Sequence, residues 1–126
     1  MIIQTKQKLL KKLTEFEELN LFTRKKISLT YVANYCETNT RYLSNIIQLK
    51  TGSKGFNKYI NDLRLEYIIK KLNEDPKYKN YKIAFLADDA GFSSANKFAT
   101  IFKQKMSVSP SLYISSLNNL NYDNQG

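Results

Sequence analysis

The chain has 126 residues and a formal net charge of +9, from 20 Lys and Arg residues against 11 Asp and Glu residues. It contains no His and one Cys, which excludes Ser–His and Cys–His nucleophilic sites, a disulfide within the chain and the usual zinc sites. A strongly basic domain usually binds a phosphate-bearing partner, either a nucleic acid or an anionic membrane surface. We therefore expect a binding protein without a cofactor or metal, and not an enzyme.

The N-terminal residues include no apolar block of the length that a signal peptide requires, and no stretch approaches the roughly 18 apolar residues of a membrane span. These absences predict a cytoplasmic protein that is not inserted in a membrane. Binding to a membrane surface stays open as an alternative, because residues 1–26 carry seven basic and three acidic side chains.

The spacing of apolar residues predicts an all-α fold, since strand-like alternation is scarce and only four Gly and two Pro residues interrupt the chain. A first helix is expected from about Thr5 to Phe22, with an inward face of Leu9, Leu13, Phe16 and Leu19. A short helix with Ser28 as its N-cap follows, and its inward residues are Leu29, Val32, Ala33 and Cys36. A third helix is expected from about Thr40 to Lys50, burying Leu43, Ile46 and Ile47.

The second half begins with a long helix from about Phe56 to Leu72, whose apolar side holds Tyr59, Ile60, Leu63, Tyr67 and Ile68. A loop over residues 73–80 is followed by a short helix over 82–90, a tight turn at Gly91 that needs positive φ, and a helix over 94–105. Ser109 and Pro110 have the pattern of an N-cap and a first helical residue, so they open a last helix to about Leu117. The polar residues 119–126 are expected to form a flexible tail.

The two halves of the chain repeat one pattern. Tyr31-Val-Ala33 matches Phe85-Leu-Ala87 after 54 residues, and the apolar stripe of the third helix matches Phe98, Ile101 and Phe102 after 55. Each half has a short helix with a central Ala, a turn, and a second helix with an apolar stripe, as in a helix-turn-helix unit. The repeat predicts two such units joined by the long helix, with a tandem array of α-hairpins as the alternative.

Several of these segments also match a known family in sequence: Arg41-Tyr-Leu-Ser-Asn45, Tyr59-Ile-Asn-Asp-Leu-Arg-Leu-Glu66, Ile83-Ala-Phe-Leu-Ala87, Gly91-Phe-Ser-Ser94, Phe98-Ala-Thr-Ile-Phe-Lys103 and Val108-Ser-Pro110. From about Ile27 to Ile114 the chain resembles the DNA-binding domain of the AraC/XylS family, in the variant of Bacteroidetes-type bacteria. The resemblance implies a bacterial transcription regulator, usually an activator, which binds double-stranded DNA. It also implies RNA polymerase as a candidate partner, and a sensing or dimerisation region elsewhere in a longer protein.

The resemblance and the repeat together divide the chain into an extra N-terminal helix or arm over 1–25, an AraC-type domain over 26–118 and the tail over 119–126. Within the domain, residues 27–52 form the first helix-turn-helix unit, 56–72 the linker helix, 82–105 the second unit and 109–117 the last helix. This homeodomain-like tandem is the predicted architecture.

A recognition helix buries one stripe and presents the opposite one to the major groove of DNA. The side chains expected to contact base edges are Thr40, Arg41, Ser44, Asn45 and Gln48 in the first unit and Asn96 and Thr100 in the second. Arg pairs bidentately with guanine and Asn or Gln with adenine. The first unit is therefore expected to specify sequence, whereas Ala95 and Ala99 limit the second mainly to positioning. The side chains expected to contact the DNA backbone are Lys50, Lys54, Lys58, Lys103 and Lys105.

Two further expectations concern residues of the interior. Asp62, Arg64 and Glu66 on the linker helix are predicted to pair internally, and Cys36 to be a small buried core residue. The basic run over 24–26 is more simply explained as a solvated linker than as a phosphate anchor.

Besides binding to a membrane surface, two alternatives to sequence-specific DNA binding remain. The same helices could form a non-enzymatic protein-interaction module whose charge serves solubility, or a DNA binder without sequence preference. A selected DNA sequence that binds far better than random duplex is expected only for the sequence-specific DNA binder.

Overall fold

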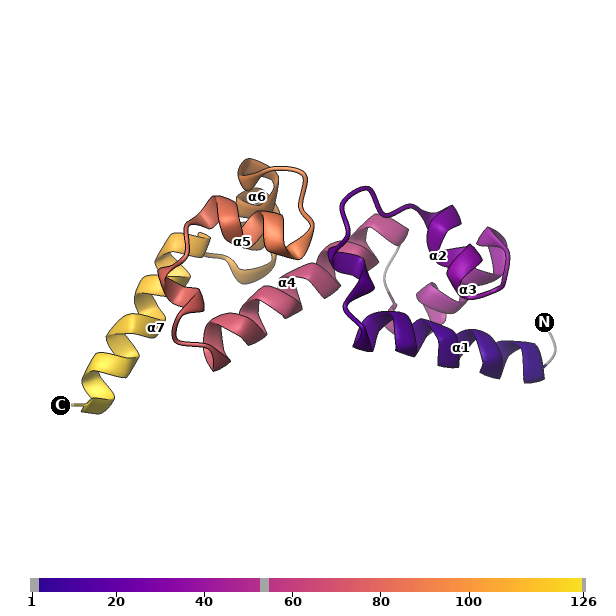
Figure 1. Ribbon diagram of the computed structural model, residues 1–126, viewed down its shortest axis with the longest axis horizontal. Coiled ribbons are helices and arrows are strands. Elements are labelled where there is room, and N and C mark those ends of the chain that lie inside the picture. Colours follow the sequence, from indigo (N-terminus) through magenta and orange to yellow (C-terminus); the bar gives the residue numbers. More distant parts are fainter. Residues whose placement is uncertain (1–2, 53–54, 126) are drawn as a thin grey trace. The chain divides into compact units, whose positions relative to one another are not determined.

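The computed structural model describes residues 3–52 and 55–125 and the side chains of these residues up to 119. Every element in the described ranges is helical, which confirms the all-α prediction (Figure 1). The α-helices are α1 (Ile3–Glu18), α2 (Leu29–Tyr35), α3 (Thr40–Thr51), α4 (Phe56–Glu74), α5 (Ile83–Ala90), α6 (Ala95–Met106) and α7 (Pro110–Gln125). Two 3₁₀ turns, η1 (Leu21–Thr23) and η2 (Tyr78–Asn80), precede α2 and α5.

The chain forms two compact units, residues 1–64 and 65–126, and the boundary between them falls inside α4. Each unit contains one helix-turn-helix pair, α2–α3 in the first and α5–α6 in the second. The predicted repeat is therefore a repeat of structure.

In unit 1, α1 is part of the core and not an arm outside it. Leu13 and Phe16 of α1 are fully buried, and the Phe16 ring centroid lies 6.5 Å from that of Phe22 and 6.0 Å from that of Tyr35 in α2. α1 therefore supplies apolar surface to the core of unit 1 that the short α2 alone does not provide.

The first helix ends earlier than expected, and this changes which residue is buried. α1 stops at Glu18, Asn20 adopts a left-handed conformation with φ of 56°, and η1 follows. The turn leaves Leu19 59% exposed and brings Phe22 into the core at 4%. The prediction of an inward Leu19 was wrong because it continued the helical period through this turn.

Side-chain caps begin α2, α3 and α6, whereas Lys82 at the start of α5 makes no side-chain cap hydrogen bond. The Ser28 hydroxyl accepts the Tyr31 N–H at 3.0 Å, as predicted, and Asn39 does the same for α3 with the Tyr42 N–H at 2.9 Å. In unit 2, the Ser94 hydroxyl accepts the Lys97 N–H at 3.0 Å. Ser109 caps α7 before Pro110, which confirms that prediction as well.

The turn inside each helix-turn-helix pair has the same geometry in both units. In unit 1 the Thr38 N–H donates to the Ala33 carbonyl at 2.9 Å, and in unit 2 the Phe92 N–H donates to the Ala87 carbonyl at 2.9 Å. The residue before each donor is left-handed: Gly91 has φ of 94°, as predicted, and Glu37 has φ of 57°. A glycine adopts this conformation without strain, whereas other residues do so at a cost.

We expect Gly91→Ala to lower the free energy of unfolding by about 1 kcal/mol, because a Cβ at positive φ is strained. Urea-induced unfolding followed by circular dichroism measures the change. Glu37→Ala is the matched control, since that position already holds a Cβ and loses only its exposed ion pair with Lys8. Equal losses in the two variants would contradict this account of the turn.

Unit 2 has its own core, to which α4, η2, α5 and α6 contribute, with Leu65, Ile68, Leu86, Phe98 and Phe102 fully buried. The prediction of a loop over 73–80 was partly wrong: α4 continues to Glu74, and Tyr78 of η2 is buried. Tyr78 can be buried because its hydroxyl donates to Asp89 Oδ2 at 2.7 Å, and the Tyr67 hydroxyl donates to the same atom at 3.0 Å. Burial and the contact with Asp89 raise the pKa of Tyr67 to about 12.

Helices α4 and α7 differ from their predicted forms in two ways. The expected apolar side of α4 included Leu63, which is half-buried, and omitted Leu65 and Leu72, which are buried. The reason is that α4 contributes to two cores, so its buried residues do not follow one stripe. The backbone of α7 is helical to Gln125, so the predicted helix end near Leu117 was wrong.

Candidate nucleic-acid interface

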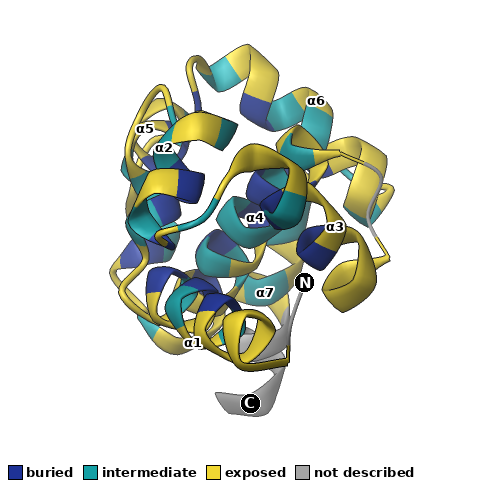
Figure 2. Ribbon diagram, turned by 90° about the vertical axis from the view of Figure 1, so that its right-hand side faces the viewer, coloured by how far each residue is buried: buried dark blue, intermediate teal, exposed yellow. Residues whose placement is uncertain are grey.

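Helix α3 has one buried side and one exposed side, as the sequence predicted. Leu43, Ile46 and Ile47 are buried in unit 1. The opposite side is exposed and polar, and consists of Thr40, Arg41, Ser44, Asn45 and Gln48. Figure 2 shows this division as dark blue and yellow segments of α3. Exposure leaves the donors and acceptors of these five side chains available to a partner; their contact with bases stays a prediction.

Helix α3 is fixed at both ends. Asn39 caps its N-terminus, and at its C-terminus Gly52, with φ of 68°, donates its N–H to the Gln48 carbonyl at 2.8 Å. The Thr51 hydroxyl also donates to the Ile47 carbonyl at 2.7 Å. These bonds satisfy backbone groups that helix ends leave without partners, so the exposed face of α3 is held by a well-terminated helix.

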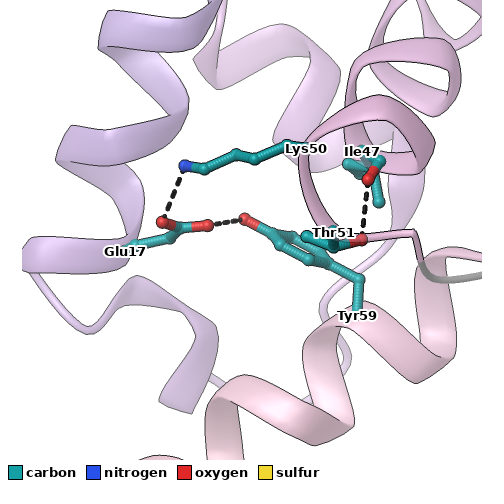
Figure 3. A network of polar contacts seen from close by, with 5 residues as sticks. All are labelled: Glu17, Ile47, Lys50, Thr51 and Tyr59. Atoms are coloured by element: carbon teal, nitrogen blue, oxygen red, sulfur yellow. Dashed lines mark hydrogen bonds and ion pairs between the residues drawn. The ribbon is translucent and has the colours of Figure 1, made fainter.

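Glu17 of α1 contacts both α3 and α4 (Figure 3). One oxygen of its carboxylate accepts a hydrogen bond from the Lys50 ammonium on α3 at 3.0 Å, and the other accepts one from the Tyr59 hydroxyl on α4 at 2.5 Å. Burial, and then the hydrogen bond to Glu17, raise the pKa of Tyr59 above its usual value, so this hydroxyl stays protonated as a donor. The contacts of Glu17 were not predicted from the sequence, because its partners lie 33 and 42 residues away in the chain.

The lysines predicted to contact the DNA backbone fall into three groups. Lys50 and Lys58 already have carboxylate partners, Glu17 and Asp62, the latter at 3.0 Å. Lys103 and Lys105 are exposed in the last turn of α6. Lys54 lies outside the described residues.

Helix α6 presents a smaller polar surface than α3. Asn96 and Thr100 are exposed, whereas Ala95 and Ala99, which precede them, are half-buried and have no polar side-chain atoms. Phe98 and Phe102 are fully buried on the other side, and the predicted inward residue Ile101 is half-buried. In the register of the repeat, three polar side chains, Asn96, Thr100 and Lys103, therefore correspond to the five of α3.

The two exposed faces share one electrostatic property: α3 and α6 contain no Asp or Glu residue. Their basic residues are Arg41 and Lys50 in α3 and Lys97, Lys103 and Lys105 in α6. By contrast, α5 contains Asp88 and Asp89. Carboxylates are thus absent from the two helices that would approach a phosphate backbone, where they would repel it.

Two arginines of unit 1, Arg24 and Arg64, make internal contacts. Arg64 donates from Nε to the Phe22 carbonyl and from Nη2 to the Arg24 carbonyl, each at 2.8 Å, so it closes the end of η1. Internal pairing of Arg64 was predicted, but the carbonyls that accept its hydrogen bonds were not. The Arg24 guanidinium carbon lies 4.9 Å from the centroid of the Tyr31 ring, and Arg24 Nη1 donates to the Tyr31 hydroxyl. Residue 24 therefore packs against α2, whereas it was predicted to belong to a solvated linker.

Cys36 is buried, as predicted, and burial raises the pKa of its thiol to about 11. Among the described residues, no helix combines the length and apolar character that crossing a membrane requires.

A family model described as a helix-turn-helix domain matches residues 32–116. Among curated proteins, the HTH-type transcriptional regulator YijO of Escherichia coli K12 is 37% identical over 82 residues, which is 65% of this chain and 27% of that protein. The TCP pilus virulence regulatory protein of Vibrio cholerae O395 is 35% identical over 71 residues, 55% of this chain and 24% of that protein. The chain thus spans about a quarter of the length of these relatives.

Solved structures share the fold. The C-terminal domain of AraT, a response regulator from Geobacillus stearothermophilus, has a TM-score of 0.70 at 23% identity, covering 86% of this chain and 84% of that one. The DNA-binding domain of AdpA, solved in complex with a target DNA, has a TM-score of 0.70 at 18% identity. The match covers 86% of this chain and 90% of that one. ToxT from Vibrio cholerae is 28% identical with a TM-score of 0.62, over 73% of this chain and 32% of that one.

Proposed function

The chain belongs to the AraC/XylS family of helix-turn-helix domains from transcription regulators, and from this premise we propose that it binds double-stranded DNA at specific sequences, mainly through α3. Domains of this family bind DNA and are not enzymes. The observation that carries the proposal is the exposed face of α3, where five polar side chains stand on a helix without carboxylates.

The chemistry of that face suits the major groove. Arg41 offers the two parallel donors that pair with guanine, and Asn45 and Gln48 each offer the donor and acceptor that pair with adenine. Each good bidentate pair contributes about 1–3 kcal/mol of discrimination against a wrong base. Thr40 and Ser44 offer hydroxyls that donate to or accept from a base edge.

Unit 2 is proposed to position the domain more than to select its sequence. Asn96 and Thr100 are its polar candidates for base contacts, and Lys103 and Lys105 at the end of α6 are proposed to bind phosphates. For Lys50 and Lys58, a phosphate would compete with Glu17 and Asp62. We therefore assign the strongest phosphate contact to Lys103.

The remaining functions are proposed for the regulator as a whole. Since the chain matches about a quarter of its curated relatives, we place effector sensing, dimerisation and contact with RNA polymerase in a longer protein of which this domain is a part. Its action is proposed to be activation of transcription in the cytoplasm. The AdpA domain with its target DNA gives a precedent for duplex binding by this fold.

A second candidate function, binding to a protein, has one observation in its favour. Tyr81 and Phe85 are exposed at 42% and 49%, and their ring centroids lie 4.7 Å apart at the start of α5. Aromatic side chains are enriched in protein interfaces. The two candidate functions can be tested together, because a protein contact at Tyr81 leaves DNA selection by α3 unchanged.

The test of the proposal is selection of bound duplexes from a pool with a randomised central segment, using the full chain. We expect a motif to be enriched over successive rounds, and its affinity to fall steeply with rising salt, as phosphate contacts require. If the duplexes recovered bind tightly but share no motif, the domain binds DNA without sequence preference and the proposal is wrong. Absence of duplex binding at low salt would favour the protein-interaction alternative.

A further inference from the structure

Leu49 was not among the predicted site residues, yet it is 73% exposed on α3. It lies four residues after Asn45, which itself lies four residues after Arg41, so the three side chains follow one side of the helix. A single exposed leucine is common on protein surfaces and needs no explanation by itself. The position of Leu49, at the edge of the polar face proposed to contact bases, is what distinguishes it.

The internal repeat shows that the fold does not require an apolar residue at this position. Leu43, Ile46 and Ile47 of α3 correspond to Phe98, Ile101 and Phe102 of α6, and the same register aligns Leu49 with Gln104. Gln104 is exposed, as Leu49 is, so neither side chain is needed by the core of its unit. An apolar residue in α3 where α6 has an amide therefore points to a difference in what the two helices contact.

We propose that Leu49 recognises thymine, by apolar contact with the C5-methyl group that thymine presents in the major groove. This inference rests on the proposed function, and it assigns Leu49 a role in specificity. Thymine is the only base of unmodified DNA with a methyl group on its major-groove edge, and apolar side chains recognise it by contact. In homeodomains, a variant of the helix-turn-helix, the base-contacting positions of the recognition helix extend over about two turns, and about two turns also separate Arg41 from Leu49.

The surroundings of Leu49 are consistent with a duplex as its partner. Its neighbours along the exposed face are Asn45 and Gln48, which offer hydrogen bonds to base edges, and α3 contains no carboxylate that would repel the backbone. Near its end, Lys50 is held by Glu17, so the last turn of α3 is fixed relative to α1. Contact with a base methyl would remove part of the exposed apolar surface of Leu49 from water.

The test uses the duplex that is enriched by selection with the full wild-type chain. Each thymine of that duplex is replaced, one at a time, by deoxyuridine, which keeps the hydrogen-bonding edge and lacks only the methyl group. We expect one replacement within the motif to weaken wild-type binding about fourfold, as loss of one buried methyl predicts. Leu49→Ala should bind the original duplex about fourfold more weakly and should show no further loss at that same thymine.

Leu112→Ala is the matched control, because Leu112 is a 55% exposed leucine on α7 and should leave both the affinity and the response to deoxyuridine unchanged. Thermal unfolding of both variants confirms that they fold. Retention of the wild-type response to deoxyuridine by Leu49→Ala, or no response to deoxyuridine at any thymine in the wild type, would overturn the assignment. Failure of the selection to enrich any motif would instead overturn the proposed function.

Discussion

Replacement of Glu17 by alanine is expected to lower the free energy of unfolding by about 3 kcal/mol, although Glu17 lies on α1, outside the helix-turn-helix pair. The Tyr59 side chain is almost fully buried, and its hydroxyl would lose its acceptor at 2.5 Å. A buried donor without a partner costs about 1–3 kcal/mol, and a hydrogen bond to a charged group adds more than a neutral one. The ion pair with Lys50 is partly solvated, so it adds the smaller share.

Urea-induced unfolding of the variant measures this loss. Glu18→Ala is the control, because Glu18 is the neighbouring residue on α1 and is exposed, so it should change the free energy of unfolding by less than about 0.5 kcal/mol. Glu17→Gln keeps an acceptor for Tyr59 and should recover part of the stability. If Glu17→Ala were no less stable than Glu18→Ala, the network of Figure 3 would not stabilise unit 1.

Replacement of Arg41 by alanine is expected to remove discrimination at one base pair of the selected duplex and not at the others. Arg41 is exposed on α3 and supplies a bidentate pair with guanine in the proposed complex. Loss of such a pair corresponds to about a 10- to 100-fold loss of preference for that base. Affinities for duplexes that carry each of the four bases at each position measure the effect.

Lys103→Ala provides the contrast with Arg41→Ala. A lysine that binds phosphate contributes affinity without sequence information, so its removal should weaken binding to all duplexes alike. It should also make the slope of log affinity against log salt concentration shallower by about one, since about one fewer counterion is released. If both variants weakened all duplexes equally, the division into sequence-specifying and backbone-contacting residues would be wrong.

The helices that follow a regular apolar period could be predicted from the sequence. In α3, the buried Leu43, Ile46 and Ile47 fix the opposite side as exposed, because three residues at this spacing define one side of a helix. The caps Ser28 and Ser109 were also predictable, since a cap depends on residues within one turn of the helix. The positive φ of Gly91 depends on the same kind of local information.

Two features that were missed do not follow from the apolar period of any one helix. The period of α1 does not reveal the left-handed turn at Asn20 that exposes Leu19 and buries Phe22. Tyr78 can be buried only because Asp89 accepts its hydroxyl, 11 residues later in the chain.

The candidate site was predictable to the same extent as the helices that carry it. The outward residues of α3 and α6 follow from helical periodicity, and all seven are exposed. The partners of Lys50 and Arg64 do not follow from it, because Glu17 and the carbonyls near η1 are brought close only by the tertiary fold. Leu49 was not among the predicted residues, because these were polar side chains and Leu49 is apolar.

The central claim, that the domain binds duplex DNA at specific sequences, is tested most directly by one ratio of affinities. The wild-type affinity for the selected duplex is divided by its affinity for a duplex of the same composition in permuted order, at one physiological salt concentration. We predict a ratio of at least about 10³, as specific DNA-binding proteins show. A ratio near one would contradict the claim, because it would mean that the basic surfaces bind phosphate while the polar face of α3 distinguishes no sequence.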